Sequence, residues 1–213
     1  MSSWLVVGIS GVTNGGKSTL AQQLQSRLPT HTQVISQDDY FYPKDSQYHV
    51  PCPGGLAHHN WDIISALDMK KMVCDVMEIV KSHPDQNDSS HKGGTGSPLS
   101  EEVGLRPVLL MDGFILYDDP EILELCDLRY FFTLTQEECW ERRSQRTYDP
   151  PDPPGYFEAC VWPMYEEHLV KVKEGVPNVV FLDGMEENLS AVLQQVTAAA
   201  RLKGKKYPGA ILG

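Results

Sequence analysis

The chain has 213 residues, of which 41% are hydrophobic and 22% are charged, and its formal net charge is −11. This length fits one α/β domain of generous size, or one domain with a lid. A net charge this negative repels polyanions, so we expect no nucleic-acid partner. No apolar run approaches the roughly 20 residues needed to cross a bilayer, so we expect no membrane partner.

The cysteine content indicates reduced thiols. There are five cysteines, which is an odd number, and none of them forms a C-x-x-C pair. This pattern argues against a disulfide framework and against a zinc knuckle, and it favours a cytoplasmic protein. The neighbouring His58 and His59 lack a third ligand at metal-site spacing, so we interpret them as loop residues. The apolar run 4–9 is too short for a signal peptide and lacks a basic flank.

The first half of the chain alternates between strand and helix patterns. Residues 4–9 form a continuous apolar run, which predicts a strand buried on both faces. Leucines at helical spacing predict a helix over 18–28 that Pro29 ends. A second strand is predicted at 34–36, before an ordered loop over 40–56. A broad apolar face predicts a helix over 62–80.

The second half begins with a polar segment over 82–106, which we interpret as a mobile surface insert because it has little apolar surface to bury. Strands are then predicted over 108–111, 130–134 and 179–182. Helices are predicted over 136–146, over 156–174 with a kink or restart near Pro163, and over 186–202. Residues 203–213 form a tail that we expect to fray.

This alternation predicts a single α/β domain over residues 1–202, with a parallel sheet and helices on both of its faces. A proline-rich stretch near 150–155 suggests a lid over about 142–156. In such sheets ligands bind beyond the carboxyl ends of the strands. The polar residues that follow each strand are therefore the candidates for a functional site.

Residues 11–18 match the phosphate-loop pattern G-x-x-x-x-G-K-[ST], and they lie between a predicted strand and a predicted helix, as that motif requires. Glycines let backbone amides turn inward around phosphate oxygens, and the helix start adds positive potential. Lys17 is expected to contact the β- and γ-phosphates, and the Ser18 hydroxyl to bind Mg²⁺. The predicted ATP site comprises Gly11, Val12, Thr13, Asn14, Gly15, Gly16, Lys17, Ser18 and Thr19.

Carboxylates follow two of the predicted strands. Asp112 ends the strand over 108–111, where a second acidic group near Mg²⁺ belongs. Asp38 and Asp39 follow the second strand, so either can act as the base for an acceptor hydroxyl. Spacing alone does not choose between these two aspartates.

Arginines and aromatics gather near the predicted lid. Arg142 and Arg146 share a face of the predicted helix and are expected to bind phosphate, although a solvated face paired with nearby glutamates is an alternative. Trp61, Tyr148 and Tyr156 lie near acidic residues. Such aromatics suit a flat polar or cationic ring, and ordinary packing is an equal alternative.

Several longer segments extend these motifs: 8–18, 34–39, 61–63, 112–114, 137–139, 142–144, 150–157, 161–165 and 182–184. On these segments the chain resembles the nicotinamide riboside kinases, members of the uridine-kinase-like group of P-loop kinases. The lid beginning Pro-Pro-Asp at 150–152 and the Val-Trp-Pro-Met-Tyr segment at 161–165 are far more specific than the phosphate loop alone.

The resemblance implies ATP- and Mg²⁺-dependent phosphorylation of the 5′-hydroxyl of nicotinamide riboside, which gives nicotinamide mononucleotide for NAD salvage. It also implies residue roles. Asp38 would activate the 5′-hydroxyl, and Asp62 with Arg143 would hold the ribose hydroxyls. Trp61 and Tyr148 would flank the nicotinamide ring, and Asp152 would lie near its carboxamide. Phe41 would be a further residue of the pocket.

Two positions depart from the family pattern. Asp112 stands where the family has glutamate, and it is shorter by about 1.5 Å, so a water can intervene at the metal. Trp61 stands where members have tyrosine or tryptophan, which is a mild change.

Three other functions compete with this one at the level of sequence. A uridine or cytidine kinase would share the same motifs. A GTP-binding switch needs an N-K-x-D motif that the sequence lacks. A non-catalytic scaffold is disfavoured by the intact Lys17, Ser18, Asp38 and Asp112. The sequence does not fix the oligomeric state, although we expect a monomer.

Overall fold

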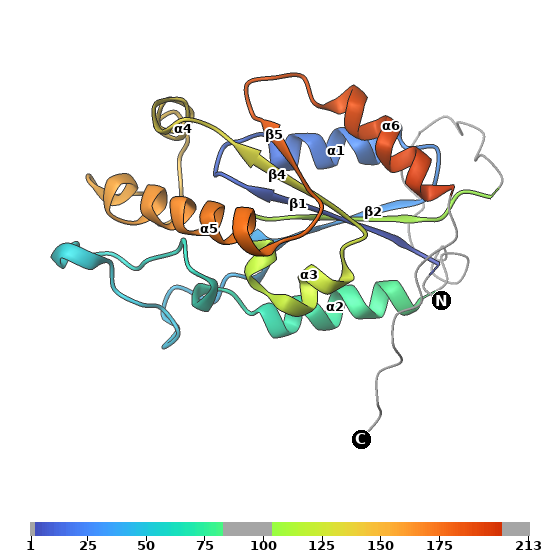
Figure 1. The fold of residues 1–213 in the computed structure, drawn as a ribbon. Helices are drawn as coiled ribbons and strands as arrows, with labels where there is room; N and C mark the ends of the chain where they lie inside the picture. The colour runs from blue at the N-terminus through green and yellow to red at the C-terminus, as the bar shows by residue number, and fades with distance from the viewer. Residues whose placement is uncertain (1–2, 83–103, 202–213) are drawn as a thin grey trace.

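A computed structural model describes residues 3–82 and 104–201 of the chain. Its centre is a parallel sheet of five strands in the order β2-β3-β1-β4-β5, which confirms the predicted α/β fold (Figure 1). The strands are β1 (Leu5–Gly11), β2 (Thr32–Ser36), β3 (Val108–Asp112), β4 (Leu128–Thr133) and β5 (Val179–Asp183).

Helices cover both faces of the sheet. On one face lie α1 (Lys17–Arg27) and α6 (Leu189–Ala200), which contact each other (Figure 1). On the other face lie α2 (Met69–Lys81), α3 (Pro120–Leu125) and α5 (Trp162–Gly175). The short helix α4 (Gln136–Arg143) follows the carboxyl end of β4. Within residues 3–82 and 104–201, no helix combines the length and the apolar character needed to cross a membrane.

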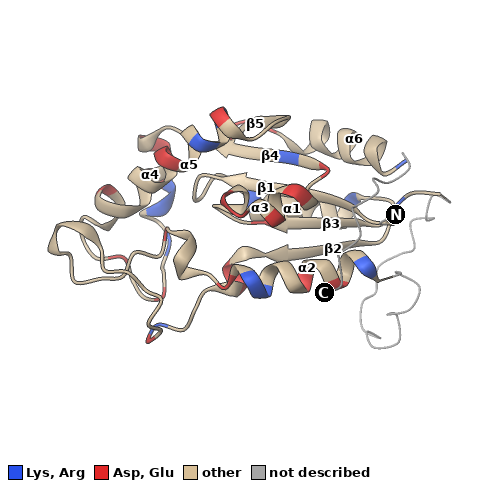
Figure 2. Cartoon of the chain, turned by 60° about the horizontal axis from the view of Figure 1, so that its bottom comes forward, with Lys and Arg blue, Asp and Glu red and all other residues tan. Residues whose placement is uncertain are grey.

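The two central strands form the core of the molecule. Every residue of β1 and of β3 is buried, and the only charged residue in either strand is Asp112 at the end of β3 (Figure 2). Burial of each large aliphatic side chain contributes about 1.5–3 kcal/mol, so these strands are firmly held. The segments that leave their carboxyl ends therefore start from a rigid support.

Two of the helix boundaries that differ from the sequence prediction affect the site. The helix predicted from residue 62 begins at Met69, because the Asp68 carboxylate accepts the backbone N–H of Lys71 at 3.0 Å and caps it. Trp61 and Asp62 therefore lie on a loop. The helix predicted over 136–146 ends at Arg143. The prediction that Arg142 and Arg146 share one helix face is therefore wrong.

Other elements match the prediction more closely. A π-helical turn over Phe157–Val161 precedes α5, which confirms a restart near Pro163. The last helix is shorter than predicted and spans Leu189–Ala200. Helix α3 was not predicted. Its sequence signal is Asp119 before Pro120, and the Asp119 carboxylate accepts the first backbone N–H groups of the helix at 3.0 Å.

The predicted insert and tail lie mostly outside the described residues, which omit 83–103 and 202–213. The two end residues of the predicted insert, Ser82 and Arg106, are anchored, so the prediction of a mobile segment is wrong for these ends. The Trp4 indole N–H donates to the carbonyl of Ser82 at 3.1 Å. The Arg106 guanidinium donates to the Trp4 carbonyl and pairs with Asp127, and the Arg106 backbone N–H donates to Ala200.

We expect Gly11→Ala to lower the free energy of unfolding by about 2–4 kcal/mol. Gly11 has a φ of 116°, and an added Cβ would lie 2.3 Å from the backbone oxygen of Phe132. Chemical denaturation measures the loss. Gly175→Ala is the control, because nothing lies within 4 Å of the added Cβ. Equal stability of the two variants would contradict this account of Gly11.

Candidate active site

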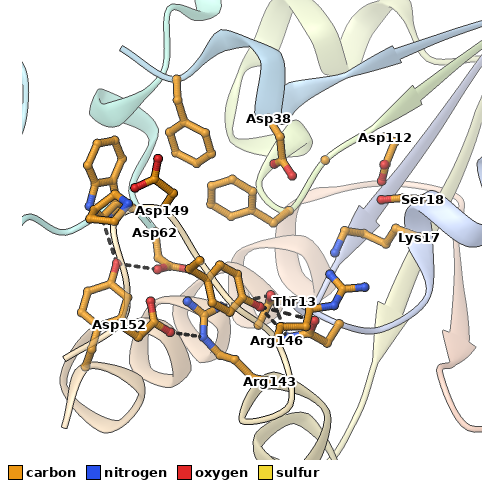
Figure 3. Close-up of a pocket in the computed structure, with 18 of the residues that line it drawn as sticks. Thr13, Lys17, Ser18, Asp38, Asp62, Asp112, Arg143, Arg146, Asp149 and Asp152 are labelled. Atoms are coloured by element: carbon orange, nitrogen blue, oxygen red, sulfur yellow. Dashed lines mark hydrogen bonds and ion pairs between the residues drawn. The ribbon is translucent and has the colours of Figure 1, made fainter. Parts of the chain in front are cut away.

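A cavity of about 380 Å³ opens where the predicted functional segments meet (Figure 3). Its walls come from the phosphate loop, from the turn after β2, from the loop that carries Trp61 and Asp62, from the end of β3, and from the segment after α4. These segments are far apart in the sequence. The fold gathers them at the carboxyl edge of the parallel sheet, where ligands of such folds bind.

The phosphate loop supplies one end of the cavity. The lining includes Thr13, Asn14, Gly16, Lys17, Ser18 and Thr19, whereas Gly11, Val12 and Gly15 do not line it. Lys17 is buried and its ammonium donates to the Val12 carbonyl at 2.7 Å. Burial lowers the pKa of Lys17, and the carboxylates of Asp112 and Asp38 oppose that shift. A buried cation at a helix start suits a polyphosphate.

Asp112 and Ser18 fit a divalent cation. Asp112 is buried, and its Oδ1 has no hydrogen-bond partner among the described residues. Burial raises the pKa of Asp112, and the Ser18 hydroxyl and the Lys17 ammonium oppose that shift. An unpaired buried carboxylate oxygen is costly unless a cation or water satisfies it, and Mg²⁺ prefers oxygen donors. Among the described residues, no group of three or more histidine, cysteine or acidic side chains forms a metal site, so a cation at Asp112 and Ser18 would take its other ligands from phosphate or water.

The structure distinguishes between the adjacent aspartates 38 and 39. Both belong to a short 3₁₀ turn, and only Asp38 lines the cavity. The preceding Gln37 is fully buried, and its Oε1 accepts the backbone N–H groups of Phe114 and Ile115 at 3.0 and 3.1 Å. This side chain ties the turn to the end of β3 and fixes the direction of Asp38.

Asp38 is exposed to solvent and lines the cavity. Removal from bulk water raises the pKa of Asp38, the Lys17 ammonium lowers it, and Asp112 raises it further. A carboxylate with a raised pKa beside a phosphate site is suited to accept a proton from an alcohol.

The lid arginines take three different places. Arg143 is buried; its Nε donates to Asp152 at 2.8 Å and its Nη1 donates to the Thr13 hydroxyl at 3.1 Å (Figure 3). Arg146 lines the cavity. Arg142 does not line it, and instead donates to the backbone carbonyls of Asn14 and Gly184, both at 3.0 Å. Arg142 therefore supports the backbone of the phosphate loop from outside the cavity.

Aromatic side chains line the other end of the cavity. Phe41 lies edge-on to Trp61 at 5.7 Å and stacks on Phe114 at 5.9 Å between ring centroids. Tyr148 lies across the cavity on the lid segment, with the Arg143 guanidinium 4.2 Å from its ring centroid. A flat ring can enter between such walls.

Tyr156, which the sequence indicated only as one of three aromatics near acidic residues, has a specific role in the site that the sequence did not predict. It is 1% exposed, and its hydroxyl donates to Asp62 Oδ2 at 2.8 Å and accepts the backbone N–H of Trp61 at 2.9 Å. Burial raises the pKa of Asp62, and Arg143 and the Tyr156 hydroxyl oppose that shift. Arg143 forms its ion pair with Asp152 and acts on Asp62 through its charge, whereas Tyr156 donates a direct hydrogen bond to the Asp62 carboxylate. The Pro-Pro-Gly-Tyr sequence of the lid is the signal that marks Tyr156.

The chain is similar to curated enzymes over most of its length. Nicotinamide riboside kinase 1 of Rattus norvegicus is 42% identical over 186 residues, which cover 86% of this chain and 89% of the relative. Nicotinamide riboside kinase 2 of Homo sapiens is 40% identical over 195 residues, which cover 90% of this chain and 80% of the relative. A uridine kinase of Leuconostoc citreum is 24% identical over 210 residues.

Among solved structures, a possible uridine kinase from Bacillus stearothermophilus has a TM-score of 0.51 at 16% identity, covering 84% of this chain and 89% of that one. This likeness supports the P-loop kinase fold. No family model matches the sequence. With about 40% identity over most of the chain to curated relatives of one name, this chain belongs to the nicotinamide riboside kinase family.

Proposed function

We propose that this chain transfers the γ-phosphate of ATP to the 5′-hydroxyl of nicotinamide riboside, giving nicotinamide mononucleotide and ADP as a step of NAD salvage. The observation that carries the proposal is that Lys17 and Asp38 line one cavity with the aromatic residues Trp61 and Tyr148. A phosphate site and a site for a flat ring thus adjoin one carboxylate. The similarity to named nicotinamide riboside kinases supports the choice of acceptor.

In this proposal the phosphate loop binds the nucleotide. Backbone amides and the Lys17 ammonium hold the β- and γ-phosphates, and Arg146 adds positive charge from the lid side of the cavity. Asp112 and the Ser18 hydroxyl would hold Mg²⁺, directly or through a water. The ion would neutralise charge that develops on the phosphate oxygens.

The acceptor lies at the other end of the cavity. Asp62 and Arg143 face the ribose hydroxyls, and Trp61 and Tyr148 flank the ring, with Phe41 at its edge and Asp152 near its carboxamide. Asp38 accepts the proton of the 5′-hydroxyl as the oxygen forms its bond to the γ-phosphorus and the bond to the ADP oxygen breaks. The lid segment closes the cavity and limits hydrolysis by water.

A panel of nucleosides tests the acceptor. We expect ADP release to be fastest with nicotinamide riboside, because acidic groups such as Asp62 and Asp152 near the aromatic walls favour a cationic ring. A preference for uridine or cytidine would reject this acceptor and leave the kinase activity standing. Binding of Mg·ATP without transfer to any nucleoside would indicate a scaffold.

We expect Asp38→Asn to lower kcat by roughly 10²–10⁴-fold, the usual contribution of a general base, while the KM for ATP stays near its wild-type value. Steady-state kinetics with nicotinamide riboside measures both. The matched control is Asp39→Asn, because Asp39 is exposed and does not line the cavity. Near-normal turnover of the Asp38 variant, or an equal loss in both, would contradict the role of Asp38.

We expect Tyr156→Phe to raise the KM for the riboside roughly tenfold or more, because the Asp62 carboxylate loses a hydrogen bond worth about 1.5–3 kcal/mol. The KM for ATP serves as the internal reference. Tyr130→Phe is the control, since its hydroxyl donates to Gln195 at 2.8 Å on α6. A riboside KM that is unchanged in Tyr156→Phe, or that rises equally in the control, would reject this role.

In the pH profile of kcat/KM for the riboside, the acid limb should have an apparent pKa above that of an ordinary aspartate. Burial raises the pKa of Asp38, so its carboxylate becomes protonated and unable to act as a base at a higher pH as the solution is acidified. A pH–rate profile locates the limb. The pKa of Asp62 is also raised, so the profile is repeated with Asp62→Asn. A limb that disappears in that variant would assign it to Asp62 instead.

A further inference from the structure

Asn14 has a backbone role that its residue type already explains. Its φ is 59°, in the left-handed region that asparagine tolerates better than most non-glycine residues. Its carbonyl accepts a hydrogen bond from Arg142 at 3.0 Å. Both features concern the main chain, and glycine would satisfy them equally well.

The Asn14 side chain makes a contact that the backbone role does not require. Its amide Nδ2 donates to the hydroxyl of Tyr148 at 3.1 Å, and that hydroxyl lies at 3.4 Å from the Asn14 Oδ1, which can accept from it. The two residues are 134 positions apart in the sequence. The same amide lies 3.3 Å from the Thr13 hydroxyl. A residue of the phosphate loop is thus bonded to an aromatic residue of the lid segment.

Tyr148 is held at two points. Asn14 binds its hydroxyl, and the Arg143 guanidinium lies 4.2 Å from the centre of its ring. Arg143 is itself fixed by the Thr13 hydroxyl and by Asp152. A tyrosine ring has two rotatable side-chain torsions, so a contact at its tip together with one at its face restrains its orientation.

We propose that Asn14 is a positioning residue for the acceptor: its side-chain amide holds the Tyr148 ring in the orientation that receives the ring of the riboside. This inference rests on the proposed function, because it takes Tyr148 to be a wall of the acceptor pocket. Holding the ring before binding removes part of the ordering cost of the complex. The same bond makes one loop serve both substrates, phosphate through its backbone and nucleoside through this side chain.

The test is a double-mutant cycle on Asn14→Gly and Tyr148→Phe, read as the KM for the riboside at saturating ATP. Glycine suits the φ of 59° and removes only the amide, and phenylalanine keeps the ring and removes only the hydroxyl. We expect each single variant to raise this KM roughly fivefold, as one neutral hydrogen bond would. The double variant should show no larger rise than Asn14→Gly alone, because both changes remove the same contact between Asn14 and Tyr148.

An additive cycle, with a rise near 25-fold in the double variant, would overturn the proposal, as would an unchanged riboside KM in Asn14→Gly. A rise confined to the KM for ATP would indicate that Asn14 serves the phosphate loop alone, and would also overturn it. Failure of the proposed function has a different signature, since the wild-type chain would then prefer another nucleoside or none. Where another nucleoside is preferred, the cycle is read with that nucleoside.

Discussion

The buried ammonium of Lys17, placed opposite the carboxylates of Asp112 and Asp38, is the interaction on which the site depends. A cation removed from water is costly unless negative groups compensate it, and the carboxylates of Asp112 and Asp38 supply that compensation here. Each one lies at or beyond the carboxyl end of a different strand of the sheet. Because β1 and β3 are buried throughout, the sheet holds these charges in place before any substrate arrives.

The acceptor side is organised by hydrogen bonds between loops, with less help from the core. Tyr156 links the lid to Asp62 and Trp61, Arg143 links it to Thr13, and Asp152 completes the ion pair of Arg143. Such polar contacts fix the orientation of these side chains but add little to the free energy of unfolding. Each contact replaces a hydrogen bond to water with one inside the protein. In the proposed function, the lid would therefore orient the nucleoside, and the rigid sheet would support the groups that bind the nucleotide.

Local patterns predicted much of this molecule. The phosphate loop and Asp112 follow from motif spacing and from strands buried on both faces, and the parallel sheet follows from the alternation of elements. Other features depend on where helices begin and end, which the spacing of apolar residues does not determine. The Asp68 cap overrides an apolar pattern that begins at Asp62, and the early end of α4 separates Arg142 from Arg146. Pattern also identifies the strand end that bears Asp38 and Asp39, but it does not reveal which side chain faces inward, since Gln37 fixes that direction through a contact some 77 residues away.

The two anchors at Trp4 have a consequence for how this chain tolerates change. One ties Ser82 and the other ties Arg106 to the same residue at the amino-terminal edge of the sheet, opposite the edge that carries the cavity. Ser82 and Arg106 are thereby held at one fixed point, and the entropy of joining two fixed points through a chain grows only with the logarithm of the chain's length. A change in the number of residues between these two anchors would therefore cost little chain entropy and would leave Ser82 and Arg106 where they are.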